Sequence, residues 1–225
     1  MSNREIGPHT RGESLFVGDL PDPSGLLHAA VLASAVPHAR IIRLDTTPAA
    51  EIDGVACVLT AADIPGENQI GGIVQDEPLL AEGEVHFIGQ PIVVTVADTP
   101  RRAREAAEAI VVEYDELPGV FDPRQAAAAG SLIVPSRTFS SGNVDDAWAS
   151  CEVVVEGSVE SGGQEHLYLE TQAALVIPQE GRRLRILSST QAPTAVQRIV
   201  ARVLGLSMND IEVDVARLGG AFGGK

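Results

Sequence analysis

The chain has 225 residues and a formal net charge of −15 at pH 7, from 31 acidic and 16 basic side chains. This acidic balance argues against a nucleic-acid partner, because it repels phosphate and offers few cations that could release counterions. The hydrophobic share of 44% is typical of a globular protein, and neither a membrane-spanning run nor a signal peptide is visible, so we expect a cytoplasmic protein without a membrane partner.

The two cysteines, Cys57 and Cys151, each lie in an apolar run. We expect buried thiols rather than a disulfide or a metal pair. Two thiols are also too few to hold an iron–sulfur cluster, which needs about four.

The first half of the chain has the pattern of a small mixed unit. Residues 1–10 show no periodicity and predict a loose end. Strands are predicted at residues 26–34, 39–45, 54–60, 85–88 and 91–97, and the last of these is almost entirely β-branched. Thr99 and Pro100 favour the start of a helix. Small apolar residues recur at helical spacing up to Ile110, which predicts a helix that packs closely on a sheet.

Residues 118–150 interrupt this pattern. Pro–Gly and Asp–Pro pairs, an alanine run and a Ser-Ser-Gly-Asn stretch predict a connecting region, where we place the domain boundary. Further strands are predicted at residues 152–160, 172–178, 183–188 and 211–215. A helix is predicted from Pro193, with Gly205 as its C-terminal stop.

Polar residues interrupt an apolar strand pattern in the stretch GGQEHLYLETQ, residues 162–172. Its two glycines allow close backbone approach, and Gln164, Glu165 and His166 offer an amide, a carboxylate and an imidazole side by side. Glu165 and His166 could suggest a zinc site together with Glu170, but such a site needs three or four ligands at workable spacing. We favour a buried, hydrogen-bonded His–Glu pair.

The stretch GGAFGGK, residues 219–225, matches the phosphate-binding pattern G-x-x-x-x-G-K and follows a predicted strand. A P-loop also needs a Ser or Thr for magnesium and a helix whose N-terminus faces the phosphates. The sequence ends at Lys225, before either could follow, so this alternative is disfavoured. A glycine-rich turn without a ligand is the other interpretation that the residues alone allow.

Several blocks together resemble the molybdenum-binding portion of the xanthine dehydrogenase and aldehyde oxidase family, from about residue 12 to residue 225. Besides the two stretches above, they are VGDLP at 17–21, GIVQDEPL at 72–79, IGQPIVVTVADT at 88–99 and EYDELP at 113–118. The resemblance implies an α+β fold: a flexible N-terminus at 1–11, an a/b hammerhead-like domain at 12–117, a connecting region at 118–150, and the beginning of a mixed α/β molybdopterin-binding domain at 151–225.

The resemblance also implies residues that bind a molybdenum-molybdopterin cofactor. Gln164 would donate a hydrogen bond to an oxygen ligand of molybdenum, and Phe222 would lie beside the metal, neither being a direct ligand. The backbone of Gly220 and Gly223 would approach the cofactor's oxygen and phosphate atoms. Gln164 and Phe222 are therefore expected to face each other across a shared cleft.

The family reaction inserts a water-derived oxygen at an electron-poor ring or aldehyde carbon, and its electrons leave through iron–sulfur centres to FAD. By the family pattern the catalytic glutamate and the substrate-binding residues follow Lys225, so we assign no catalytic residue. The resemblance implies a truncated front part, inactive alone, whose partners are the FAD and 2Fe-2S subunits or domains, the remaining molybdopterin-binding region and a small-molecule substrate such as a purine. The competing interpretation is a non-catalytic interaction module that docks iron–sulfur and flavin partners.

Overall fold

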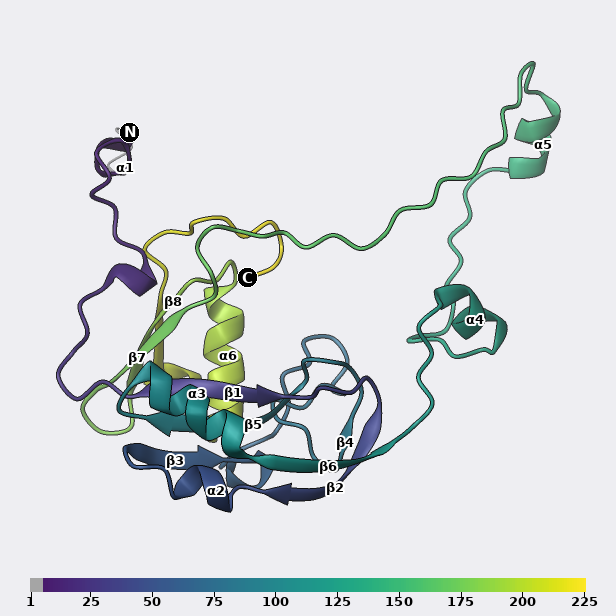
Figure 1. The fold of residues 1–225 in the computed structure, drawn as a ribbon. Helices are drawn as coiled ribbons and strands as arrows, with labels where there is room; N and C mark the ends of the chain where they lie inside the picture. Colours follow the sequence, from purple (N-terminus) through teal and green to yellow (C-terminus); the bar gives the residue numbers. More distant parts are fainter. Residues whose placement is uncertain (1–5) are drawn as a thin grey trace. The chain divides into compact units, whose positions relative to one another are not determined.

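The computed structural model describes residues 6–225 and has the α+β architecture that was predicted, with three three-stranded sheets (Figure 1). Residues 1–5 of the predicted loose end lie outside the described residues, whereas Ile6–Thr10 form the short helix α1, which buries no side chain. The chain divides into two compact units. One contains the residues up to Pro118 together with His166–Lys225, and the other is Gly119–Glu165.

The first two sheets take all their strands from the part of the chain before Leu117. Their orders are β1-β5-β3 and β4-β2-β6, and all neighbouring strands are antiparallel. The bounds are β1 His28–Ala33, β2 Ala39–Asp45, β3 Val55–Leu59, β4 Glu84–Val85, β5 Pro91–Ala97 and β6 Val111–Glu116. Three further short helices lie in this region: η1 Val17–Asp19, α2 Thr47–Ala50 and η2 Ala61–Asp63.

Helix α3, Pro100–Ala109, lies against β1 and β5 (Figure 1). Thr99 caps it by accepting a hydrogen bond from the Arg102 N–H at 3.3 Å, and proline occupies the first helical position, as predicted. Ala103 and Ala106 have no exposed surface. Their small side chains allow the close helix–sheet approach that the alanine pattern indicated.

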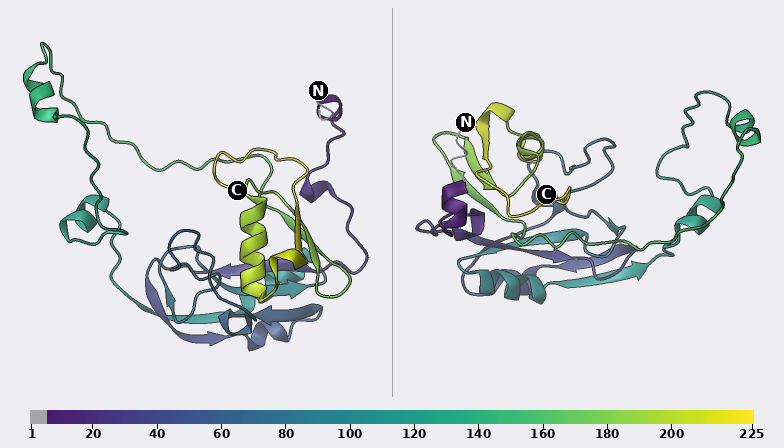
Figure 2. Two further views of the ribbon diagram at one scale, coloured as in Figure 1. Left: turned by 180° about the vertical axis from the view of Figure 1, so that it is seen from behind. Right: turned by 90° about the horizontal axis from the view of Figure 1, so that it is seen from above.

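The third sheet has the order β7-β8-β9, with bounds Ala174–Pro178, Leu184–Ser188 and Ile211–Asp214. β8 and β9 are parallel, so helix α6, Pro193–Leu204, forms the crossover between them and lies beside the sheet (Figure 2). Gly205 ends α6 in the left-handed conformation at φ 61°, as predicted. The short helix η3, Met208–Asp210, leads into β9.

The C-terminal end of α6 contacts the loop around Gly66. The N–H of Gly66 donates to the Val203 carbonyl at 2.9 Å, and that of Glu67 to the Arg202 carbonyl at 3.1 Å. Carbonyls in the last turn of a helix have no partner within the helix, so the loop supplies one. A Cβ at Gly66 would lie 2.1 Å from the Arg202 oxygen, which leaves room for glycine alone.

The segment Gly119–Glu165 has no buried residue and contains two short helices, α4 Pro123–Ala128 and α5 Val144–Ala149 (Figure 1). The strand predicted at residues 152–160 is not formed: within the described chain this stretch pairs with no strand. Val153, Val155 and Val159 do alternate, but they are 79%, 87% and 98% exposed. Alternation gives a strand only where a neighbouring strand accepts and donates the ladder hydrogen bonds.

The prediction of buried thiols is wrong, since Cys57 and Cys151 are both free and exposed. Cys57 lies in the edge strand β3, where the register shifts between Val55 and Cys57 and both Ala56 and Cys57 are exposed. Cys151 follows α5 in the segment that buries nothing. None of the helices described over residues 6–225 is long and apolar enough to span a bilayer. The predicted domain bounds at 117 and 150 stay a prediction.

Candidate functional site

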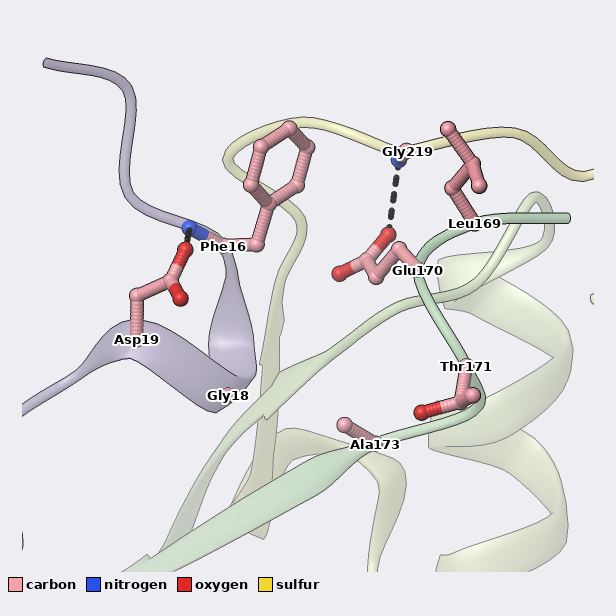
Figure 3. A pocket seen from close by; sticks show the side chains of 8 residues that line it. All are labelled: Phe16, Gly18, Asp19, Leu169, Glu170, Thr171, Ala173 and Gly219. Atoms are coloured by element: carbon pink, nitrogen blue, oxygen red, sulfur yellow. Dashed lines mark hydrogen bonds between the residues drawn. The ribbon is translucent and has the colours of Figure 1, made fainter. Parts of the chain in front are cut away.

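The two motifs of the second half, the stretches 162–172 and 219–225, are joined by two hydrogen bonds and an ion pair. The Glu170 N–H donates to the Gly219 carbonyl at 3.1 Å, and the Gly219 N–H donates to Glu170 Oε2 at 2.7 Å (Figure 3). Lys225 Nζ lies 3.0 Å from the same carboxylate oxygen, with side-chain exposures of 0% for Lys225 and 9% for Glu170. The carboxylate therefore closes the glycine-rich loop at both of its ends.

Tyr168 and Glu170 explain why three of the loop residues are glycines. A Cβ at Gly224 would lie 2.8 Å from Cε1 of its ring, and a Cβ at Gly220 would lie 2.9 Å from its Cβ. At Gly219, a Cβ would lie 2.5 Å from the Cβ of Glu170. The ammonium of Lys225 lies 4.7 Å from the Tyr168 ring centroid, a cation–π arrangement. The loop packs directly on the second half of the polar stretch.

Two glutamines also hold the loop. Gln191 Oε1 accepts from the N–H of Gly223 at 2.9 Å and from that of Lys225 at 3.4 Å. Gln172 Nε2 donates to the Tyr168 hydroxyl at 2.9 Å and to the Gly224 carbonyl at 3.3 Å. Sequence reasoning did not single out Tyr168, Gln172 or Gln191. The first two lie inside the quoted stretch, while nothing local marked Gln191.

The ionisation of Glu170 follows from these contacts. Burial by itself raises the pKa of a carboxyl, but the hydrogen bonds from Gly219 and Lys225 and the charge of Lys225 together lower the pKa of Glu170 below its ordinary value. Its other oxygen, Oε1, is buried and has no hydrogen-bond partner among the described residues. The backbone N–H of Val17 also contributes to lowering the pKa of this carboxyl.

A cleft of about 560 Å³ adjoins Glu170 (Figure 3). Phe16, Gly18 and Asp19 line one part of it, and the N–H of Phe16 donates to Asp19 Oδ2 at 2.9 Å. The other lining residues are Leu169, Glu170, Thr171, Ala173 and Gly219. A short N-terminal segment and both motifs of the second half thus meet around one space.

The middle of the loop contains backbone donors without partners. Among the described residues, the N–H groups of Gly220, Ala221 and Phe222 have no hydrogen-bond partner. Phe222 has a positive φ of 52°, uncommon for a residue other than glycine, and its side chain is 72% exposed. Successive free amides in such a turn suit oxygen-rich or anionic groups.

The same geometry argues against a P-loop. The P-loop lysine must reach the phosphates of a nucleotide. Here Lys225 has no exposed side-chain surface and is bound to Glu170. Its positive charge is already paired with the Glu170 carboxylate.

The other predicted site residues are placed as follows. Gln164 and Glu165 end the segment Gly119–Glu165, while Phe222 belongs to the other unit, so the expected approach of Gln164 to Phe222 stays a prediction. Glu165 and His166 are exposed, which contradicts the predicted buried pair. Burial was inferred from the apolar context of a strand, and that strand is not formed.

The comparisons with known proteins match both halves of the chain. The family model "Aldehyde oxidase and xanthine dehydrogenase, a/b hammerhead domain" matches residues 11–118, and the model "Molybdopterin cofactor-binding domain" matches residues 127–225. A xanthine dehydrogenase of Oryza sativa subsp. japonica is 40% identical over 218 residues, which is 95% of this chain. The aldehyde oxidase 4 of Cavia porcellus is 42% identical over 219 residues, or 96% of the chain.

Solved structures resemble the chain in the same way. The aldehyde oxidoreductase of Desulfovibrio gigas gives a TM-score of 0.85 at 28% identity, over 96% of this chain and 26% of that one. Quinoline 2-oxidoreductase from Pseudomonas putida 86 gives 0.82 at 31% identity, over 99% of this chain and 30% of that one. The chain spans only 16% of the length of the curated relatives that it matches.

Proposed function

Because this chain belongs to the xanthine dehydrogenase and aldehyde oxidase family, we propose that it forms part of the molybdopterin-binding region of a cytoplasmic molybdenum hydroxylase. Its substrates would be purines, related N-heterocycles or aldehydes, and the inserted oxygen would come from water. The chain spans 16% of its curated relatives, which supports the further proposal that FAD and 2Fe-2S domains or subunits and additional molybdopterin-binding sequence complete the enzyme.

The observation that supports this function best is the row of free amides at Gly220, Ala221 and Phe222, held in place by the Glu170–Lys225 pair. Oxo and phosphate oxygens of a molybdopterin cofactor are acceptors that such amides fit. The donor set therefore suits the group, which supplies the two-electron redox chemistry when bound.

The role of this chain's residues would be to bind and orient. Phe222 would contribute an exposed ring beside the metal, and Gly220 and Gly223 would keep the backbone bare where the cofactor approaches. Gln164 would donate one neutral hydrogen bond near the metal without competing as a ligand.

Molybdenum content, pterin content and turnover of the complete enzyme test the proposal. We expect Phe222→Ala to lower molybdenum and pterin content, with Phe139→Ala as control because Phe139 is 94% exposed in the segment Gly119–Glu165. We expect Gln164→Ala to lower turnover about two- to tenfold, the effect of losing one hydrogen bond. The exposed Gln179 gives the matched control Gln179→Ala.

Two results would contradict the proposal. An enzyme that contains neither molybdenum nor pterin would favour the interaction-module interpretation. Full molybdenum content and unchanged turnover in both variants would show that the cofactor lies elsewhere.

A further inference from the structure

Three side chains with metal-ligand atoms gather on the outer face of the sheet β4-β2-β6. Ala39 pairs with Val85 across β2 and β4, and neither has exposed surface. Because successive side chains of a strand point to opposite faces, Glu84 and His86 on either side of Val85 point outward. His38, next to Ala39, joins them, since extending the antiparallel register by one residue sets it opposite His86.

The distances among these groups approach those of a metal site. His38 Nε2 lies 3.0 Å from Glu84 Oε1, and His86 Nδ1 lies 3.6 Å from the same oxygen. The ligand atoms of all three lie within 4.8 Å of one another. Zinc binds its ligands at about 2.0–2.1 Å, so two ligand atoms lie at most about 4 Å apart. The His86 side chain, 58% exposed, has room to close the remaining gap.

A hydrogen bond already orients the imidazole of His38, and another fixes the main chain of His86. His38 Nδ1 lies 2.9 Å from the Pro118 carbonyl, and a carbonyl can only accept, so Nδ1 carries hydrogen and Nε2 faces Glu84. Outer bonds of this kind set the tautomer and ring orientation of metal-binding histidines. The main chain of His86 is fixed by Gln90, 2% exposed, whose Oε1 accepts from the His86 N–H at 2.7 Å.

We propose that His38, Glu84 and His86 bind a divalent transition metal of the Zn²⁺ type, with water completing the coordination. Two imidazoles and one carboxylate are a ligand set that zinc uses when one position stays open, whereas Mg²⁺ and Ca²⁺ prefer oxygen ligands alone. The metal replaces the proton that His38 Nε2 shares with Glu84, and the proton leaves to solvent. Arg40 lies opposite Glu84 in the register of β2 and β4. Its guanidinium forms an ion pair with the carboxylate of Asp115 at 3.8 Å.

The bound metal would join two segments of the chain directly, and a third through the hydrogen bond between His38 and Pro118. His38 directly precedes β2. Glu84 lies in β4, and His86 directly follows it. Pro118, which orients His38, follows β6. A metal here would therefore stabilise the sheet where the chain leaves it.

Calorimetric titration of the 225-residue chain with Zn²⁺ tests this site. The exposed Cys57 and Cys151 are first changed to serine, so that their thiols contribute no ligand. We expect one Zn²⁺ per chain and a higher melting temperature in its presence, because a ligand that binds only the folded state stabilises it. Mg²⁺ is expected to give neither effect.

Variants in this background locate the binding. His86→Ala and Glu84→Gln are expected to weaken Zn²⁺ binding at least about tenfold, while His28→Ala, in β1, leaves it unchanged. Circular dichroism without metal verifies that each variant folds. If a variant does not fold, the Co²⁺ complex of the parent decides: tetrahedral visible bands with imidazole ligation support the site. Absence of one-to-one binding, or equal affinity of the parent and a folded His86→Ala variant, would overturn it and leave an ion pair between His38 and Glu84.

Discussion

Lys225 and Glu170 are 55 residues apart in sequence and form an ion pair of 3.0 Å with almost no exposed side-chain surface. The pair holds the glycine-rich loop against the polar stretch whose Tyr168 and Gln172 also contact the loop. This buried charge pair therefore acts together with Tyr168, Gln172 and Gln191 in holding the candidate cofactor site.

Removing one partner of this pair should destabilise the protein. In Lys225→Met the carboxylate of Glu170 stays buried without its cation, and we expect a loss of about 3 kcal/mol in the free energy of unfolding. The double variant Lys225→Met/Glu170→Gln should recover part of the loss, because no uncompensated charge remains. Urea unfolding measures both. Glu105→Gln, which breaks the exposed Arg101–Glu105 pair, is the control and should be neutral; a Lys225→Met variant equally neutral would contradict the argument.

The pH dependence of stability should report on the same carboxyl. The folded-state pKa of Glu170 lies below its ordinary value, so its ionised form contributes stability above the unfolded pKa of about 4.3. That contribution is lost as the pH falls through the folded pKa. The difference in unfolding free energy between the wild type and Glu170→Gln should therefore shrink as the pH falls from 6 to below 4. A difference that stays constant over this range would show that the charge of Glu170 does not matter.

Gly66 should not tolerate a side chain. In Gly66→Ala the added Cβ meets the Arg202 carbonyl, so the loop must move and its hydrogen bonds to Val203 and Arg202 are weakened. Overpacking of this kind costs about 1–3 kcal/mol. Thermal and chemical unfolding measure the loss. Gly72→Ala is the matched control, because nothing lies within 4 Å of a Cβ built there.

Phe222 should be retained for function rather than stability. Its φ of 52° costs a residue with a Cβ about 1 kcal/mol, so Phe222→Gly is expected to keep or raise the free energy of unfolding. Phe139→Gly, at a position without a positive φ, should not raise the free energy of unfolding. If the proposed cofactor site is right, the same Phe222→Gly variant lowers molybdenum content in the complete enzyme. A clear loss of stability on Phe222→Gly would show that the ring packs in the fold.

Local chemistry predicted the local structure well. Thr99 and Pro100 start α3 and Gly205 ends α6 as expected, because caps depend on a few consecutive residues. The prediction of a strand at residues 152–160 was wrong, because a strand needs a neighbouring strand and alternation in the sequence does not show whether one is there. The prediction that Cys57 is buried was wrong because an apolar run does not show which side of an edge strand faces the solvent.

The sites show the same limit. Gln164, Gly220, Phe222 and Gly223 came from a resemblance, and the glycines indeed lie in a loop that needs them. The partners that hold this loop, Glu170, Lys225 and Gln191, meet only through the tertiary fold. Likewise, no spacing in the sequence connects His38 with His86, because their proximity depends on the pairing of β2 with β4.

The segment Gly119–Glu165 interrupts one compact unit, whose remaining parts contact each other through Gly66, Val203 and their neighbours. Those contacts do not require the peptide chain to be continuous. A protease that cuts the exposed valines near residue 155 would therefore leave two fragments that still migrate together under native conditions and separate only in denaturant. The two fragments are held together by non-covalent packing. A version of this protein expressed as two polypeptides could therefore assemble with the glycine-rich loop and the Glu170–Lys225 ion pair intact.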